Sequence, residues 1–301
     1  MANSHTLVED FAAGRPFRKS LSSSTNYGAL RLSFDEKYFY SYRMKLAYRD
    51  PQGNVIINGD GAPSVTTRKH QQLIRILPGP QIPFSVLERL NTPVEEIRIV
   101  HAKSDFVLTR KVLCKGTDDK PCWRENHETH HGRLYHFVEE HFLGETLFEH
   151  GGDLYISGLD RNEPPRSRHF YVVRLPAGCG AKTVDAGLEA LRPSHVPESA
   201  LRQGEWFFVP TDHKTAGKLV KSLHLVGPLK EHIHKSVPLD DRPGRHVVSQ
   251  LIASDGRRFA SGVVRDQQHA TLKLPDVWHE VVRNLSRGGF SIDASNRVNV
   301  D

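Results

Sequence analysis

The sequence predicts an α+β protein made mostly of antiparallel β-strands, barrel- or sandwich-like, with a few short helices and two domains. Apolar and polar residues alternate in many short segments that end at turn residues. A strand, a glycine turn and a second strand recur at residues 145–159, 205–226 and 246–265, which suits an antiparallel barrel or sandwich. A length of 301 residues fits two domains or one large β-rich domain.

The N-terminal part begins with a segment that lacks hydrophobic periodicity. Residues 1–28 end in LSSSTNYG and are predicted to form a flexible arm with little fixed structure. An N-terminal α+β domain is predicted over residues 29–114. It starts with alternating apolar residues at 30–34 and continues through YFYSYRMKLAYRD, which is typical of one aromatic strand. PQGN then turns the chain into a strand at residues 55–57.

A helix is predicted in SVTTRKHQQLIRIL, because Ser64 or Thr67 can cap its start and Pro78 follows its end. Its apolar stripe would consist of Leu73, Ile76 and Leu77.

The second half is predicted to be a β-rich domain over residues 134–301, joined through a polar linker at 115–133 that has little to bury. Within it, Thr183 is expected to cap a short helix that covers one end of a barrel. Residues 206–208, Trp-Phe-Phe, are expected to lie in the core.

The most regular stretch is residues 246–284, where alternating segments predict a β-meander. Asp255-Gly256 is expected to turn its first hairpin, because a tight primed turn needs positive φ angles that glycine adopts freely and aspartate tolerates.

The formal charge of +6 and the pI near 9.2 favour a polyanionic partner such as DNA or RNA, because lysine and arginine release counterions from phosphates. A surface of mixed, solvated charges would explain the same composition. The three cysteines, Cys114, Cys122 and Cys179, are irregularly spaced, and we expect reduced thiols. The N-terminus lacks an apolar signal segment and no run is apolar enough for a membrane helix, so we expect a cytoplasmic protein.

Two segments of the N-terminal part carry a resemblance. SYRMKLAYRD followed by SVTTRKHQQLIR resembles the S-Y-x-x-x-[IL]-A … S-V-T-T-x-x-H-Q pattern of an uncharacterised domain of bacteriophage, plasmid and bacterial proteins, although Met44 replaces a smaller polar residue. HFLGETLF, YISGLDRNE, RQGEWFFVP and WHEVVRN are similar to segments of hypothetical proteins of environmental bacteria, planctomycetes among them. The resemblance implies a bacterial or mobile-element setting and no particular activity.

The basic start of the predicted helix is a candidate nucleic-acid site, because its hydroxyls, amides and cations are groups that contact phosphates and base edges. The alternative is that Thr67 caps a helix with a solvated polar face. The residues predicted to bind nucleic acid are Thr66, Thr67, Arg68, Lys69, His70, Gln71 and Arg75.

His127, Glu128 and His131 fit the H-E-x-x-H pattern, in which two histidines one helical turn apart bind zinc and the glutamate activates water. The surrounding residues offer no apolar face to hold a helix, so we expect His127 and His131 not to share a metal. A second histidine group, His246, His269 and His279, could meet at one end of the meander to bind zinc, or could be solvated at strand ends.

Together these features favour a non-enzymatic module that binds nucleic acid or another polyanion. Two alternatives stay open: a metal-dependent hydrolase that uses a histidine cluster, and a protein-interaction or structural subunit.

Overall fold

A computed structural model describes much of the chain, and all structural statements below refer to that part. The described residues are 4–16, 32–109, 112–113, 127–130, 133–136, 140–159, 170–212, 215, 218, 237–239, 246–254, 256–266, 271–286, 289–292 and 298–300.

The first sheet has five strands that follow one another in sequence order. They are β1 (Leu32–Phe34), β2 (Tyr38–Ser41), β3 (Met44–Arg49), β4 (Val55–Asn58) and β5 (Gln81–Ile82). The last strand is parallel to β4 and the other neighbours are antiparallel. The segment predicted as one aromatic strand is two strands, because Tyr42 adopts a φ of 57° and the chain reverses between Ser41 and Met44.

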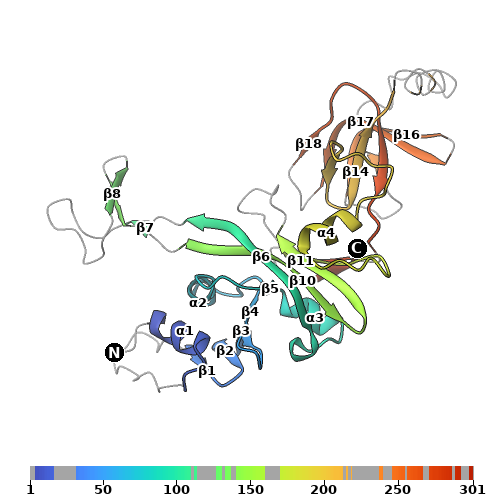
Figure 1. Cartoon of the computed structure of the whole chain (residues 1–301). Coiled ribbons are helices and arrows are strands. Elements are labelled where there is room, and N and C mark those ends of the chain that lie inside the picture. The colour runs from blue at the N-terminus through green and yellow to red at the C-terminus, as the bar shows by residue number, and fades with distance from the viewer. Residues whose placement is uncertain are drawn as a thin grey trace.

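Two helices cover one face of this sheet, α1 (Ser4–Ala12) and α2 (Val65–Ile74). Figure 1 shows both helices beside β1–β3. Leu7, Val8 and Phe11 are buried against Phe39 of β2 in the core below. The prediction of an arm with little fixed structure is therefore wrong for Ser4–Ala12, since this apolar stripe buries enough surface to offset the entropy of ordering the helix.

The second sheet joins strands from distant parts of the sequence, in the order β21-β20-β12-β11-β10-β6. Its strands are β6 (Arg98–Thr109), β10 (Glu140–His150), β11 (Asp153–Leu159), β12 (Phe170–Arg174), β20 (Gly289–Ile292) and β21 (Val298–Val300). The long antiparallel pair β6 and β10 spans the predicted linker at 115–133. The predicted boundary between residues 114 and 134 therefore cuts through one continuous sheet.

A small sheet lies beyond the far end of β6 and β10, well away from the other labelled elements (Figure 1). It contains β7 (Val112–Leu113), β9 (Arg133–His136) and β8 (His127–His130).

The first two sheets pack together as a sandwich. Tyr38 and Ile82 of the first sheet share a core with Phe148 and Tyr155 of the second. The backbone N–H of Gln81 donates to Thr146 Oγ1 at 2.9 Å, which joins β5 to β10. Helix α3 (Phe84–Arg89), followed by the 3₁₀ turn η1 (Val94–Glu96), adds apolar side chains to the same core.

The third sheet follows the order β13-β14-β19-β17-β16-β15, with β18 also paired to β17. Its strands are β13 (Leu201–Gln203), β14 (Trp206–Pro210), β15 (Val237–Pro238), β16 (Val247–Ser254), β17 (Arg257–Arg265), β18 (Leu272–Lys273) and β19 (His279–Arg283). The predicted hairpin is confirmed as β16 and β17, with Gly256 at a φ of 71°, while Asp255 lies outside the described residues. Trp206, Phe207 and Phe208 are buried, as predicted.

Helix α4 (Val184–Ala190) is capped by Thr183, whose Oγ1 accepts from the N–H of Ala186 at 3.2 Å. It packs on β6, β10 and β11 of the second sheet. The expectation that it covers a barrel end is wrong, because within the described residues no sheet closes on itself. The fold is thus α+β with open, mostly antiparallel sheets, the sandwich-like of the two predicted forms. Across the same residues, every helix is too short or too polar to cross a membrane.

Candidate functional site

Helix α2, which carries the residues predicted to bind nucleic acid, turns some of them inward. Thr67, His70 and Gln71 are 4%, 1% and 3% exposed, so the prediction that these three contact nucleic acid is wrong. Thr66, Arg68 and Lys69 are exposed to solvent. The buried stripe also includes Ile74, whereas Leu73, Ile76 and Leu77 of the predicted apolar stripe are only partly buried. The inward face of α2 is therefore largely polar.

His70 is fixed from below by a serine of the first sheet. Its Nδ1 lies 2.7 Å from Ser41 Oγ, and both residues are 1% exposed. Burial lowers the pKa of His70 below its usual value, because an apolar environment disfavours the charged imidazolium. The ring is therefore neutral at pH 7, and its bond to Ser41 positions α2 over the sheet.

Gln71 and Arg75 face a second buried polar group, Asp60. Gln71 Nε2 donates to the Asp60 backbone carbonyl at 2.7 Å. The Asp60 carboxylate accepts from Ser85 N at 3.0 Å and from Ser85 Oγ at 2.6 Å. Burial raises the pKa of Asp60, although the bonds from Ser85 oppose the shift.

Arg75 is the remaining residue of the predicted set, and it is half-buried within range of the charge of Asp60. Burial lowers its pKa to about 10, while the charge of Asp60 acts in the opposite direction. The guanidinium is still protonated at pH 7, and Asp60 is the carboxylate that stabilises its charge. Arg75 is therefore only partly exposed, and its contact with a phosphate stays a prediction.

The exposed side of α2 gains two residues from the turn between β2 and β3. Tyr42 is 45% exposed, and its ring centroid lies 6.2 Å from that of His70 at an interplanar angle of 29°. Arg43 follows it and is exposed. We call the exposed set Tyr42, Arg43, Thr66, Arg68 and Lys69 the α2 face.

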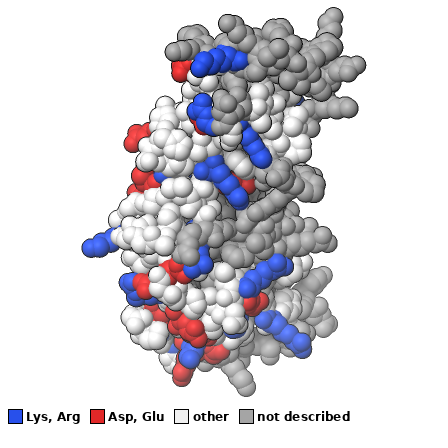
Figure 2. All heavy atoms as spheres, turned by 90° about the vertical axis from the view of Figure 1, so that its right-hand side faces the viewer, with Lys and Arg blue, Asp and Glu red and all other residues white. Residues whose placement is uncertain are grey.

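The two segments that carry the α2 face contain only basic charges. The sequence contains no Asp or Glu in residues 38–49 or 61–87. Among the described residues, no carboxylate forms an ion pair with Arg43, Arg68 or Lys69. The side of the molecule in Figure 2 differs, because its basic and acidic side chains are interspersed. The described charges of these two surfaces are therefore distributed differently.

Sequence reasoning missed Tyr42 and Arg43, because the aromatic run that contains them suggests one continuous strand. The available signal was the short polar interruption Ser41-Tyr42-Arg43, which separates two alternating segments.

The H-E-x-x-H segment does not form the helix that its zinc-site interpretation needs. His127–His130 is strand β8, in which Glu128 opposes Tyr135 and His127 opposes His136. The spacing that brings residues i and i+4 together on a helix does not apply to a strand. His131 lies outside the described residues.

The second histidine group is not brought together either. His246 Nδ1 lies 3.7 Å from Asp266 Oδ2, just beyond the end of β17, whereas His279 pairs with Ala260 within that strand. Six strand residues span about 20 Å, which is too far for two imidazoles to share one ion with bonds of about 2 Å. Both histidines are buried, so the solvated alternative is also wrong for them; His269 lies outside the described residues. Within the described ranges, no three His, Cys, Asp or Glu residues form a group that could hold a metal ion.

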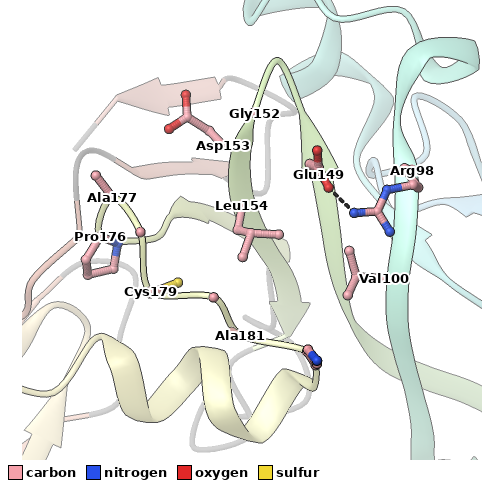
Figure 3. Close-up of a pocket in the computed structure, with 13 residues that line it drawn as sticks. Arg98, Val100, Glu149, Gly152, Asp153, Leu154, Pro176, Ala177, Cys179 and Ala181 are labelled. Carbon is pink, nitrogen blue, oxygen red and sulfur yellow. Dashed lines mark hydrogen bonds and ion pairs between the residues drawn. The ribbon is translucent and has the colours of Figure 1, made fainter.

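A pocket of about 630 Å³ lies between the β10–β11 hairpin and the loop that leads into α4. Figure 3 shows Val100, Leu154 and Cys179 around it, together with the Arg98–Glu149 ion pair. Asp153 pairs with Arg174, so both carboxylates of the pocket already have cationic partners. The Cys179 thiol is free, while Cys114 and Cys122 lie outside the described residues. Such a pocket could hold a small molecule with an apolar body, but it presents no unpaired carboxylate to act as a general acid or base.

Comparison of the chain with protein-family models, with curated proteins and with solved structures finds no match. The resemblance of its N-terminal segments to phage and plasmid proteins therefore stays a prediction.

Proposed function

We propose that this chain is a nucleic-acid-binding module that uses the α2 face to contact phosphates. The observation that carries the proposal is the group of three exposed cations, Arg43, Arg68 and Lys69, that no described carboxylate neutralises. Cations of this kind release condensed counterions when they approach a nucleic acid, which gives sequence-independent affinity.

The buried side of α2 supports this role. The Ser41–His70 bond and the Gln71–Asp60 bond hold the helix on the sheet, so its exposed side chains project from a fixed backbone. Rigid placement lowers the conformational entropy lost on binding. A bacterial or mobile-element setting and a cytoplasmic location belong to the same proposal, and they rest on the resemblance and on the composition.

Fluorescence anisotropy with labelled random-sequence DNA and RNA, single- and double-stranded, tests the proposal. We expect dissociation constants of about 10⁻⁴ to 10⁻⁶ M near physiological salt, and affinity that decreases linearly with the logarithm of the salt concentration. Absence of binding below ~100 μM at low salt would be weaker than ordinary non-specific association. That result would overturn the proposal and leave a protein-interaction subunit as the better interpretation.

A further inference from the structure

Tyr42 occupies an unusual backbone position on the α2 face. It is the first of the two residues in the turn between β2 and β3, and its φ of 57° lies in the left-handed region that side-chain-bearing residues rarely adopt. Glycine or asparagine would fit this position with less strain. An exposed aromatic residue at such a position suggests a role that the turn itself does not require.

The ring of Tyr42 stacks on a side chain that is itself held in place. His70 lies under it in a roughly parallel orientation, and His70 is itself held by Ser41. His70 is almost fully buried, whereas Tyr42 is 45% exposed, so part of the tyrosine stays accessible to solvent. The arrangement is a fixed aromatic platform.

Cations flank this platform along the chain on both elements. Arg43 follows Tyr42 in the turn, and Lys69 precedes His70 in α2. Proteins bind single strands by combining exposed aromatic residues with nearby cations, since an aromatic ring stacks on a base and the cations contact the neighbouring phosphates.

We infer that the α2 face selects single-stranded nucleic acid and stacks one base on Tyr42. This inference rests on the function proposed above and specifies its ligand. A duplex keeps its bases stacked inside, so it can use the cations of the α2 face but not the ring. Single strands therefore gain a contact that a duplex lacks.

Three labelled probes of equal length separate the two contributions: an oligothymidine of about 15 nucleotides, an abasic strand with the same phosphates and no bases, and a duplex. The wild-type protein should bind the oligothymidine at least about fivefold more tightly than the abasic strand. The Tyr42→Ala variant should lose this difference and bind both strands alike. Tyr42→Phe should keep it, because the stacking ring is retained.

Two further variants guard against misfolding as the cause. Tyr42→Gly removes the ring and relieves the left-handed backbone, so it should fold at least as stably as wild type and still lose the preference. Leu285→Ala removes another exposed apolar side chain, 48% exposed and beyond the end of β19, and should bind all probes as wild type does.

The outcomes distinguish this inference from the proposal beneath it. Equal binding of oligothymidine and abasic strand by the wild type, or an unchanged preference in Tyr42→Ala, would overturn the stacking inference and leave phosphate binding intact. Failure of all three probes to bind would remove both.

Discussion

Helices α2 and α4 have the same kind of N-cap and packing, but the charges on their exposed sides differ. Each starts with a hydroxyl N-cap, Ser64 or Thr183, and each packs against one face of a sheet. On α4, Asp185 pairs with Lys103 at 3.1 Å and Glu189 pairs with Arg192 at 3.2 Å. On α2 the exposed charges are all positive, and no described carboxylate pairs with them.

This difference indicates what each surface can do. The charges of α4 are balanced by neighbours, so they contribute solubility and little attraction for an external ion. The charges of α2 face solvent and keep their full capacity to attract an anion. The comparison separates a helix whose exposed charges have partners from one whose exposed cations have no described carboxylate partner.

The largest expected effect tests what the two helices share, which is their packing on a sheet. Ile74 under α2 and Leu191 at the end of α4 are both 0% exposed, so each change to alanine should destabilise the protein by about 2–5 kcal/mol through lost burial and a new cavity. Urea unfolding measures both. A loss under 1 kcal/mol for Ile74→Ala alone would mean that α2 does not pack on the first sheet as described.

Two double variants that remove the same net charge test what differs between the helices, which is the charge of their exposed sides. Arg68→Ala with Lys69→Ala should weaken nucleic-acid binding about tenfold at low salt and reduce the salt slope by about one to two. Lys103→Ala with Arg192→Ala removes the same charge from the surroundings of α4 and should leave binding nearly unchanged. Anisotropy titrations at several salt concentrations compare them, and equal losses would attribute binding to total charge instead of the α2 face.

The two helix caps should contribute about equally to the stability of the protein. Ser64 Oγ accepts from the N–H of Thr67 at 3.1 Å, as Thr183 Oγ1 does from Ala186. Replacement of either by alanine should lower the free energy of unfolding by about 1 kcal/mol. Thermal or urea unfolding checks this, and a far larger cost at Ser64 would point to its additional contact with Thr67 Oγ1.

The smallest expected effect is a pH dependence of the free energy of unfolding that arises from His70 of α2. Burial lowers the pKa of His70 and of His279 below 6.5, so the unfolded chain takes up protons first as pH falls. Stability should therefore be full above pH 6.5 and decline as pH falls below it. Urea unfolding between pH 5 and 8 should show a weaker decline for His70→Gln. The exposed His195→Gln is the control, and an equal change in both variants would contradict the assignment.

Features set by neighbouring residues could be predicted from the sequence. The two N-caps, the turn at Asp50–Asn54 and the β16–β17 hairpin depend on local turn and cap chemistry, and the structure contains them. The basic residues Arg68 and Lys69 were also placed correctly on an exposed helix face.

Features set by distant partners could not be predicted. The burial of His70 depends on Ser41, and that of Gln71 depends on Asp60, which helical periodicity does not reveal. Similarly, the pairing of β6 with β10 spans a polar stretch whose composition suggested a linker. Local propensity does not indicate which surface another element will cover.

The second sheet has a consequence for how the chain is made. Val172 of β12 pairs with Phe290 of β20, while the other side of β12 pairs with β11, its immediate predecessor among the strands. During synthesis, β12 is thus an uncovered edge until the ribosome has released residues 289–292, and an exposed edge strand can pair with other chains. Such late, non-local pairing slows folding. A nascent chain arrested before residue 289 should therefore depend more on chaperones than the released protein does.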